Sequence, residues 1–346
     1  MTRPETGGPS REGAEKPPFT VKESQRGIPF CTANFAVEPP LVARQQETRN
    51  DIRALTNLAL QGGAAADAAT RRFTELGPGV TLLRTKATKF NALEVAYTGM
   101  TPEEIQASNE VIRSGHLLRI PPDQMTDGDY FLRHSLNMIG VRERFQVVKY
   151  LVGVAIKERR IPDRQESIGI ISIACGSSRA VLEAMKETDV PTAGVPQSRG
   201  FLLDIDSNAL GYSSHLAGKM KIKDRIETAR ENFFRPDATV STRGRKFVIA
   251  EKVGLDDYLD DEQLVDILQR TASLLEPEGT IIFGNIQDNP ERDFLHKVIG
   301  WPDMVYRTPD DLARIISLAF PGAADVALYE VPSKLYTVAQ VTPNSR

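Results

Sequence analysis

Small and polar residues follow an apolar, β-branched run in the middle of the chain. Residues 168–174 read IGIISIA, and Cys175, Gly176, Ser177 and Ser178 come directly after them. A glycine at a strand end permits a tight turn and a close approach of backbone N–H groups to a ligand, and a serine can cap the next helix. The segment matches neither GxGxxG nor a P-loop, so a plain strand-to-helix turn remains the alternative to a ligand-binding turn.

Two aspartates follow the next apolar run, GFLLDI at 200–205. Asp204 comes after Gly176 by somewhat more than the roughly 20 residues typical of a nucleotide-binding βαβ unit. A carboxylate at this position can accept hydrogen bonds from both hydroxyls of a ribose. Asp206 precedes a helical pattern, so we expect it to cap that helix or to lie near the edge of an adenine.

Acidic and aromatic residues follow two later runs. Asp256–Asp261 is rich in acids and contains Tyr258, and residues 300–312 hold the only tryptophan, Trp301, with Tyr306 and Arg307. Aromatic side chains beside an arginine can form an apolar pocket with an anion-binding group. Residues 300–312 can equally well be interpreted as a packed linker. The acids of 256–261 can equally well be interpreted as a solvated acidic face.

Regular alternation of short apolar runs with amphipathic helical segments predicts the elements that position these residues. The strand patterns are residues 168–174, 200–205, 225–229, 246–251, 280–285, 325–330 and 334–341. This alternation predicts a doubly wound α/β fold, a seven-stranded and mostly parallel sheet in residues 161–346. The last two strands are joined by only Val331, Pro332 and Ser333, so they form a terminal antiparallel hairpin. Ligands bind such sheets beyond the carboxyl ends of the strands.

The first half of the chain has a different pattern. Residues 1–25 combine Pro, Gly, Ser and charges with few large apolar residues, which predicts a disordered tail. Residues 26–160 are predicted to be a helical region, with a clear apolar stripe from Gly140 to Arg160. We expect this region to fold over the site as a lid and to complete an acceptor pocket. His134 is its candidate base, although a lone histidine is more often structural.

Composition excludes several classes of protein. The 346 residues include 43 Lys and Arg against 46 Asp and Glu, a formal net charge of -3, which does not suit a nucleic-acid partner. The two cysteines stand far apart with no Cys or His grouping, so we expect no metal site and no disulfide framework. No apolar run is long enough for a membrane span, and the chain begins without a signal-peptide pattern, which predicts a cytoplasmic protein.

Taken together, these segments resemble a class I S-adenosylmethionine-dependent methyltransferase, over about half of the chain. The strings SIACGSSRAVLEA, LLDIDSNAL, VGLDDYLDD, FGNIQDNPERDF and GWPDMVYRTPDDL look like a bacterial subgroup of these enzymes. One branch of that subgroup forms methyl esters of hydroxy fatty acids.

The resemblance implies specific roles in cofactor binding. The turn would hold the methionine portion of S-adenosylmethionine, Asp204 its ribose, and Asn232 would lie beside the adenine with Asp206 near. Glu251 and the residues up to Gly254 would lie under the sulfonium. The turn residues are Ala174, Cys175, Gly176 and Ser177. The sequence departs from the family at Ser172, where an acid is frequent, and at Ala174 and Ser178, which replace outer glycines.

The expected reaction is methyl transfer to a carboxylate or hydroxyl oxygen of a small or lipid-like acceptor. Tyr258, Arg307 and His134 are the candidate catalytic residues, and Tyr258, Trp301, Tyr306 and Arg307 are the candidate acceptor-binding residues. Two alternatives stay open. One is a non-catalytic S-adenosylmethionine-binding or interaction module, and the other is an aminopropyl transferase, whose polyamine substrate the acids of 256–261 would suit.

Overall fold

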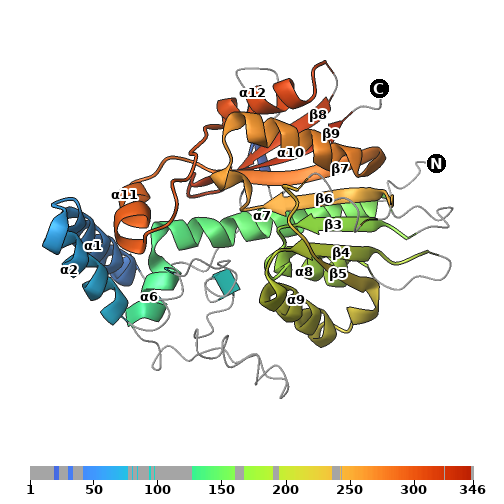
Figure 1. Cartoon of the computed structure of the whole chain (residues 1–346). Helices are drawn as coiled ribbons and strands as arrows, with labels where there is room; N and C mark the ends of the chain where they lie inside the picture. The colour runs from blue at the N-terminus through green and yellow to red at the C-terminus, as the bar shows by residue number, and fades with distance from the viewer. Residues whose placement is uncertain are drawn as a thin grey trace, which may run out of the picture.

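A computed structural model of the chain describes the elements that carry these residues (Figure 1). The described residues are 19–22, 30–33, 42–76, 80, 84, 93–94, 97, 127–159, 167–189, 195–235, 242, 244–322 and 324–343.

A single twisted sheet forms the centre of the molecule. In the described part of the chain it has nine strands in the order β1-β2-β8-β9-β7-β6-β3-β4-β5. Its strands are β1 (Phe19–Lys22), β2 (Phe30–Ala33), β3 (Gly169–Ile173), β4 (Arg199–Asp204), β5 (Ile226–Arg230), β6 (Phe247–Val253), β7 (Leu275–Ile286), β8 (Ala324–Glu330) and β9 (Tyr336–Pro343). The pairs β7·β6, β6·β3, β3·β4 and β4·β5 are parallel, whereas β8 and β9 form an antiparallel hairpin whose second strand pairs with β7. The predicted mostly parallel α/β sheet with its hairpin is confirmed.

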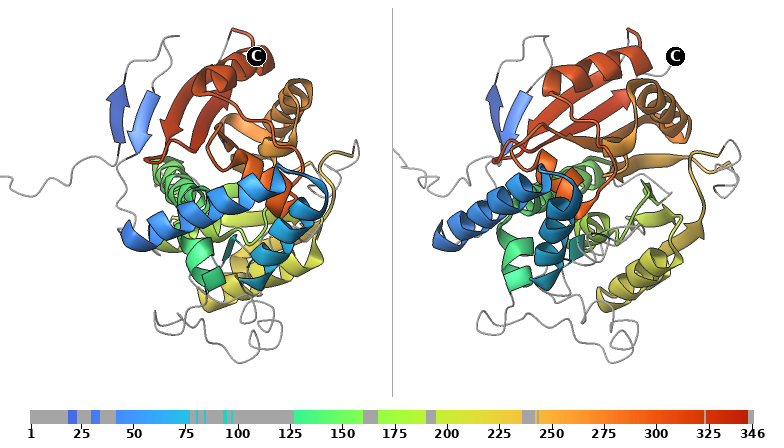
Figure 2. Two further views of the ribbon diagram at one scale, coloured as in Figure 1. Left: turned by 90° about the vertical axis from the view of Figure 1, so that its left-hand side faces the viewer. Right: turned by 60° about the vertical axis from the view of Figure 1, so that its left-hand side comes forward.

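Two short strands correct the predicted strand count of seven. β1 pairs antiparallel with β2, and β2 pairs parallel with β8, so both extend the sheet beyond the hairpin (Figure 2). β1 lies inside the segment predicted to be a disordered tail, and β2 lies inside the region predicted to be helical. Each strand has only four residues. Such a strand gives little periodicity to recognise, because its place in the sheet is set by pairing: β2 pairs with the edge of β8, and β1 pairs with β2. The rest of residues 1–25 lies outside the described residues.

Alternating side chains of the strands form a core on each face of the sheet. In β3, Ile170 belongs to the cluster shared with the helices α7 (Leu136–Arg159), α8 (Arg179–Thr188) and α9 (Ser207–Lys219). Its neighbours Ile171 and Ile173 belong to the cluster under α10 (Asp261–Ser273) and α12 (Pro309–Ala319). Figure 1 shows these two helix layers on opposite sides of the strands. Burial on both faces explains why the strands read as continuous apolar runs.

Local capping sets where several helices begin. Asp206 caps α9 by accepting from the backbone N–H of Asn208, and both Asp260 and Thr308 form capping boxes with the residue three positions later. Short helical turns complete the domain: η2 (Lys223–Arg225), η4 (Asp256–Tyr258), α11 (Arg292–Phe294) and η5 (Leu295–Ile299). The turn η4 matters for the site, because it starts at the end of β6.

The N-terminal helices pack at one end of the sheet domain. The helices α1 (Val42–Ala59), α2 (Gly63–Glu75) and α6 (Asp127–His134) gather near α11 (Figures 1 and 2). Phe73, Phe131 and Phe294 stack edge to face or tilted, with ring centroids 5.1 to 5.4 Å apart. This aromatic cluster joins α2 and α6 to α11 across most of the chain's length.

The long helix α7 connects that end to the sheet. Glu291 caps its start, because its two carboxylate oxygens accept from the backbone N–H groups of Leu136 at 2.7 Å and Asn137 at 2.8 Å. The predicted stripe of Val141, Phe145, Val148, Val152 and Ile156 is buried. α7 therefore packs against the sheet in the same helix layer as α8.

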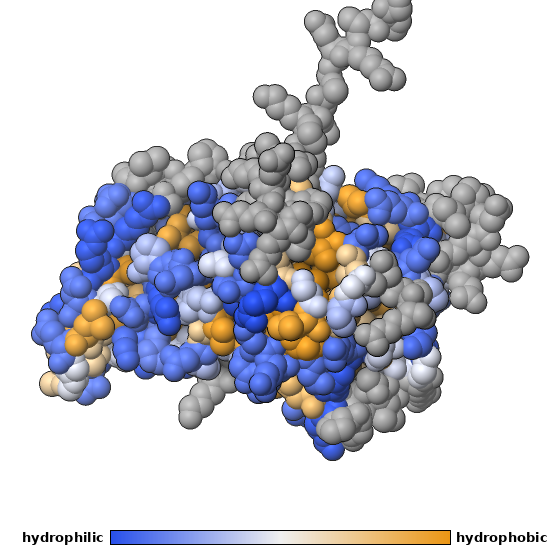
Figure 3. Space-filling view, turned by 90° about the horizontal axis from the view of Figure 1, so that it is seen from above, coloured by the Kyte–Doolittle hydropathy of each residue, from blue (hydrophilic) through white to orange (hydrophobic). Residues whose placement is uncertain are grey.

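Among the described helices, none combines the length and the hydrophobicity that a membrane crossing requires. Seen from the side of α10 and α12, hydrophilic residues cover most of the described surface, with smaller apolar areas between them (Figure 3).

Candidate functional site

A cavity of about 930 Å³ lies at the carboxyl ends of β3, β4 and β6. This is the edge at which parallel α/β sheets bind ligands. Its lining mixes polar residues from the strand ends with aliphatic and aromatic side chains from later loops and from α7. Of the predicted site residues, it contains Ala174, Gly176, Asp204, Asp206, Asn232, Tyr258 and Trp301.

The turn after β3 has the backbone of a glycine-rich loop. Ala174, Gly176 and Ser178 have φ angles of 52°, 53° and 51°, in the left-handed region. Ala174 and Ser178 are the positions at which the sequence lacks the outer glycines of the family that it resembles. The backbone shape is thus kept at some conformational cost, since a residue with a Cβ disfavours this region. Cys175 and Ser177 belong to the turn, but neither lines the cavity, and burial raises the pKa of the Cys175 thiol.

Asp204 joins this turn to the end of β4. Its Oδ2 accepts from the N–H of Gly176 at 2.8 Å, and its Oδ1 accepts from the N–H of Asp206 at 2.9 Å. Each carboxylate oxygen has two lone pairs, so both can still accept a hydroxyl donor from the cavity. Burial raises the pKa of Asp204, and these two backbone hydrogen bonds oppose that shift. Asn232 lies nearby after β5, where its Oδ1 accepts from the N–H of Phe234 at 3.0 Å.

Glu251 is placed just beneath the cavity rather than in its wall. It is 7% exposed, its Oε2 accepts from the Ser172 hydroxyl at 2.5 Å, and its Oε1 accepts from the N–H of Val253 at 3.1 Å. Burial raises the pKa of Glu251 to about 7. Ser172 thus donates to a carboxylate of the adjacent strand, at a position where the family that the sequence resembles often has an acid. The next residues, Val253 and Gly254, do line the cavity.

Aromatic and apolar residues form the other end of the cavity. Tyr258, Trp301, Pro302, Met304 and Tyr336 line it. Tyr258 is 38% exposed, so it stands at the cavity surface, whereas Trp301 is 6% exposed. Tyr306 is not in the wall, because its ring stacks under the guanidinium of Arg292 at 4.6 Å. The segment that begins at Trp301 therefore contributes one of its two aromatic residues to the pocket.

The position of Arg307 corrects its predicted role as an anion-binding and catalytic residue. Its guanidinium is buried and donates to Asp261 Oδ1 from Nε and Nη2, to Asn285 Oδ1, and to the carbonyls of Asp256 and Leu259. These five contacts use the donor capacity of the side chain. Arg307 fastens the 256–261 loop to β7 and does not line the cavity.

His134 is likewise placed away from the predicted reaction. It is buried at the end of α6 and does not line the cavity. The physical reason is that α6 packs on the aromatic cluster with α2 and α11, beyond the start of α7. His134 therefore cannot accept a proton from a group bound in the cavity.

The acids of 256–261 are paired within the protein. Asp256 pairs with Lys252, Asp257 lies 3.6 Å from Nη1 of Arg144, and Asp261 binds Arg307. Asp260 caps α10. This run therefore does not present a free acidic surface of the kind a polyamine needs.

Arg144 of α7 is a cavity residue that was not predicted from the sequence. It lines the cavity at 5% exposure, its guanidinium carbon lies 4.5 Å from the centre of the Tyr336 ring, and Tyr97 hydrogen-bonds it. The available signal was its spacing: Arg144 lies three residues after Val141, on the same helix stripe. A charge on an apolar stripe indicates either a buried partner or a site.

A short N-terminal segment also reaches the cavity. Leu93 lines it, and the next residue, Glu94, is fully buried. Both carboxylate oxygens of Glu94 accept from Arg179 at the start of α8, and the Tyr212 hydroxyl donates to it at 2.8 Å. The segment is therefore anchored directly behind the turn that holds Gly176.

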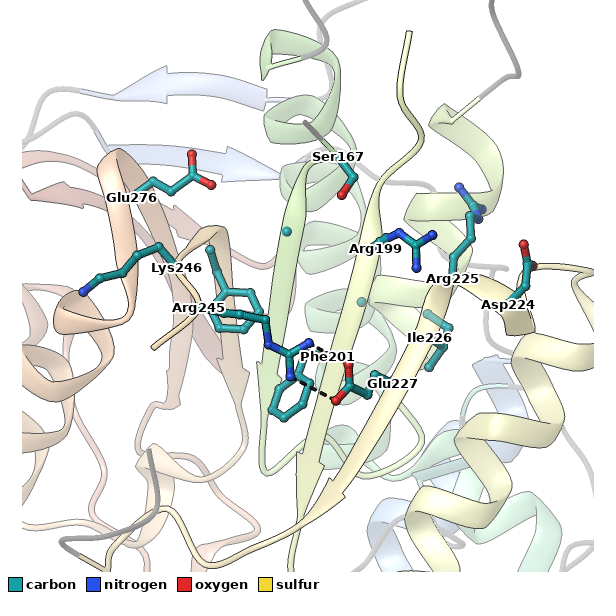
Figure 4. Close-up of a pocket in the computed structure, with 13 residues that line it drawn as sticks. Ser167, Arg199, Phe201, Asp224, Arg225, Ile226, Glu227, Arg245, Lys246 and Glu276 are labelled. Carbon is teal, nitrogen blue, oxygen red and sulfur yellow. Dashed lines mark hydrogen bonds and ion pairs between the residues drawn. The ribbon is translucent and has the colours of Figure 1, made fainter. Parts of the chain in front are cut away.

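A second hollow, of about 760 Å³, lies at the opposite ends of the strands (Figure 4). Arg245 and Glu227 form a bidentate pair there, with hydrogen bonds of 2.6 and 2.9 Å. Arg225 in its wall pairs with Asp189. These are the amino ends of the parallel strands, so this hollow is not on the ligand-binding edge.

The fold is similar to those of known structures. A possible exported protein from Bordetella parapertussis matches with a TM-score of 0.54 and 14% identity, over 89% of this chain and 100% of that one. An O-methyltransferase family protein from Burkholderia thailandensis matches with a TM-score of 0.45 and 14% identity, over 90% and 99%. Magnesium protoporphyrin IX methyltransferase from Synechocystis PCC 6803, with bound SAH, matches with 0.44 and 11%, over 61% and 88%. None of the curated proteins matches the chain.

A family assignment comes from the sequence. Residues 119–300, more than half of the chain, match the family described as "Putative methyltransferase". The matched range starts before α6 and includes the glycine turn, Asp204, η4 and Gly300. The chain belongs to this methyltransferase family.

Proposed function

We propose that the protein transfers a methyl group from S-adenosylmethionine to an oxygen atom of a small or lipid-like acceptor. The observation that carries this proposal is the cavity of about 930 Å³ at the carboxyl ends of β3, β4 and β6. One end of that cavity offers the Asp204 carboxylate and the Gly176 turn, and the other offers an apolar, aromatic wall with one buried arginine. A nucleoside and an apolar acceptor would meet between them.

The residues present fit a nucleoside-containing methyl donor. The Asp204 carboxylate is fixed by two backbone N–H groups and keeps acceptor capacity toward the cavity, as ribose hydroxyls require. Gly254 has a φ of 100°, and it leaves the cavity floor open where β6 ends. A volume of about 930 Å³ is in the range of small-molecule sites. Asn232 and Asp206 line the same cavity as Asp204 and are the proposed neighbours of the adenine. Structures of methyltransferases with bound SAH or SAM are among those that resemble this fold.

When bound, S-adenosylmethionine supplies a methyl group on a positively charged sulfur. The protein's part is to align the acceptor oxygen and to exclude water, and orientation of this kind can lower a barrier by about 7–11 kcal/mol. A carboxylate acceptor needs no base. A hydroxyl acceptor needs one, and His134 lies outside the cavity. The buried guanidinium of Arg144 in the cavity wall favours a carboxylate oxygen. We propose that the chain belongs to the bacterial subgroup that it resembles, one branch of which forms methyl esters.

Incubation with methyl-labelled S-adenosylmethionine and a panel of carboxylic acids and hydroxy acids tests the proposal. We expect labelled product that extracts with the acids and is hydrolysed by mild alkali, as an ester is. Binding of the methyl donor without product from any acceptor would instead support the non-catalytic module. A product heavier by an aminopropyl rather than a methyl unit would identify an aminopropyl transferase, which the paired acids of 256–261 do not favour.

The proposed setting is the cytoplasm, with a small-molecule partner and no nucleic acid. The net charge of -3 supports the last point. Cys31 and Cys175 are both free thiols, as a reducing compartment would keep them.

A further inference from the structure

Arg144 differs from the other buried arginines of the described chain in what surrounds it. Its guanidinium lies under the aromatic wall of the cavity, over Tyr336 and beside the end of β6. A Cβ atom added to Gly254 would lie 3.7 Å from its Nη2. The charge is therefore located where the floor of the cavity passes from β6 into η4.

The partners of Arg144 leave donor capacity unused. Its ion pair with Asp257 spans 3.6 Å, longer than the roughly 2.7–2.9 Å of a charge-assisted hydrogen bond. Tyr97 takes one hydrogen bond, and the ring of Tyr336 takes none. Arg307 makes five hydrogen bonds with a side chain of the same type. Arg179 makes a bidentate contact with Glu94, from Nε to Oε1 and from Nη2 to Oε2.

Asp257 stays in place independently of Arg144. Its Oδ1 accepts from the N–H of Ile286 at 2.7 Å, and its carbonyl accepts from the N–H of Val305 at 2.8 Å. Its Oδ2 lies 3.6 Å from Nη1 of Arg144, which is an ion pair but too long for a hydrogen bond. The planar fork of a guanidinium offers a second edge, so another carboxylate can bind there while Asp257 holds the first.

We propose that Arg144 binds the carboxylate of the methyl acceptor and is the residue that selects acids over alcohols in this cavity. This inference rests on the proposed function, because the bound acid is a methyl acceptor only if the protein is a methyltransferase. The cavity walls around Arg144 indicate what the rest of the acceptor molecule is like. Val141, Trp301, Pro302 and Met304 offer aliphatic and aromatic surface to a carbon skeleton, and apolar burial provides affinity there while the guanidinium provides selectivity.

The test measures binding by calorimetry with full-length protein saturated with S-adenosylhomocysteine. The probes are straight-chain and aromatic carboxylic acids, each paired with the primary alcohol of the same skeleton. We expect the wild type to bind acids more tightly than the paired alcohols by about tenfold or more, the value of a charged hydrogen bond. Arg144→Gln should remove that preference and leave affinity for the alcohols within about twofold.

Two further variants keep the test decisive. Arg144→Lys keeps the charge without the bidentate fork, so it should restore part of the preference if Arg144→Gln folds poorly. Arg159→Gln makes the same exchange on α7 at its exposed end, where Arg159 pairs with Glu278, and should behave as wild type. An acid preference that survives in Arg144→Gln, or a wild type that binds no acid better than its alcohol, overturns the inference.

The failure of this inference is distinguishable from the failure of the proposed function. If methyl is transferred to alcohols and acids are not preferred, the proposed methyltransferase activity is supported and the carboxylate site at Arg144 is contradicted. If acids bind in a way that depends on Arg144 but no probe is methylated, the carboxylate site is supported and the proposed methyltransferase activity is contradicted.

Discussion

The backbone N–H of Gly176 donates a hydrogen bond of 2.8 Å to Oδ2 of Asp204. This contact joins the turn after β3 to the end of β4, two segments that approach each other only because the strands are parallel neighbours. Asp204 therefore has two roles. It fixes the shape of the turn, and it offers its remaining lone pairs to the cavity.

Replacing Asp204 by alanine should weaken S-adenosylmethionine binding by roughly tenfold or more, since hydrogen bonds to a charged group contribute about 1.5–3 kcal/mol. Titration calorimetry measures this directly. Asp288→Asn is the matched control, because Asp288 is an exposed aspartate that pairs with Arg292. Equal affinity in wild type and Asp204→Ala would show that this carboxylate does not bind the ligand.

Arg307→Met should destabilise the fold by about 2–5 kcal/mol, because the buried acceptors around it lose their donor. Its effect on acceptor binding should be no larger than that loss of fold explains. Urea unfolding measures the stability. Arg314→Met is the control, since Arg314 binds the other oxygen of Asp261 from a half-exposed position and should cost under about 1 kcal/mol. Similar costs for the two variants would contradict the structural role of Arg307.

The stability of the protein should fall as pH rises from about 4.5 to about 7, in part because of Glu251. Burial raises its pKa from 4.5 to about 7 in the folded state. In that window the unfolded chain has lost the Glu251 proton and the folded chain has kept it, so rising pH favours the unfolded state. Glu251→Gln removes this contribution and should flatten the curve by about 2–4 kcal/mol.

Urea unfolding of wild type and Glu251→Gln at a series of pH values between these limits measures the difference. Subtracting one curve from the other isolates Glu251 from Asp257, whose pKa burial raises to about 6. Parallel curves would mean that Glu251 has an ordinary pKa in the folded protein.

Glu94→Gln should weaken S-adenosylmethionine binding by roughly tenfold, equivalent to about 1.4 kcal/mol. The reason is that Glu94 anchors the segment whose Leu93 lines the cavity. Glu183→Gln is a close control, because Glu183 also binds Arg179, at 3.2 Å, but belongs to α8 itself. If both variants bind the methyl donor as wild type does, the N-terminal region does not act as a lid on the cofactor.

Much of the sheet domain could be predicted because its signals are local. Continuous apolar runs identify strands buried on two faces, and Asp206 caps α9 through its own neighbours. The five residues between β8 and β9 are too few for a parallel crossover, so the two strands form a hairpin. The edge strands β1 and β2 could not be predicted, because four residues carry little periodicity and their pairing depends on β8, far away in the sequence.

The two arginines show the limit most clearly. The sequence by itself determined the alternation of strands and helices, the turn at Gly176 and the acid at 204, since each follows from backbone geometry within a few residues. It placed the anion-binding role on Arg307 because aromatic residues stand beside it in the chain. Only the tertiary structure showed that carbonyl groups of residues 256 and 259 already occupy Arg307. It also brought Arg144 of α7 to Asp257, more than 100 residues away. Which donors stay unused in a pocket depends on long-range packing, and no local pattern encodes it.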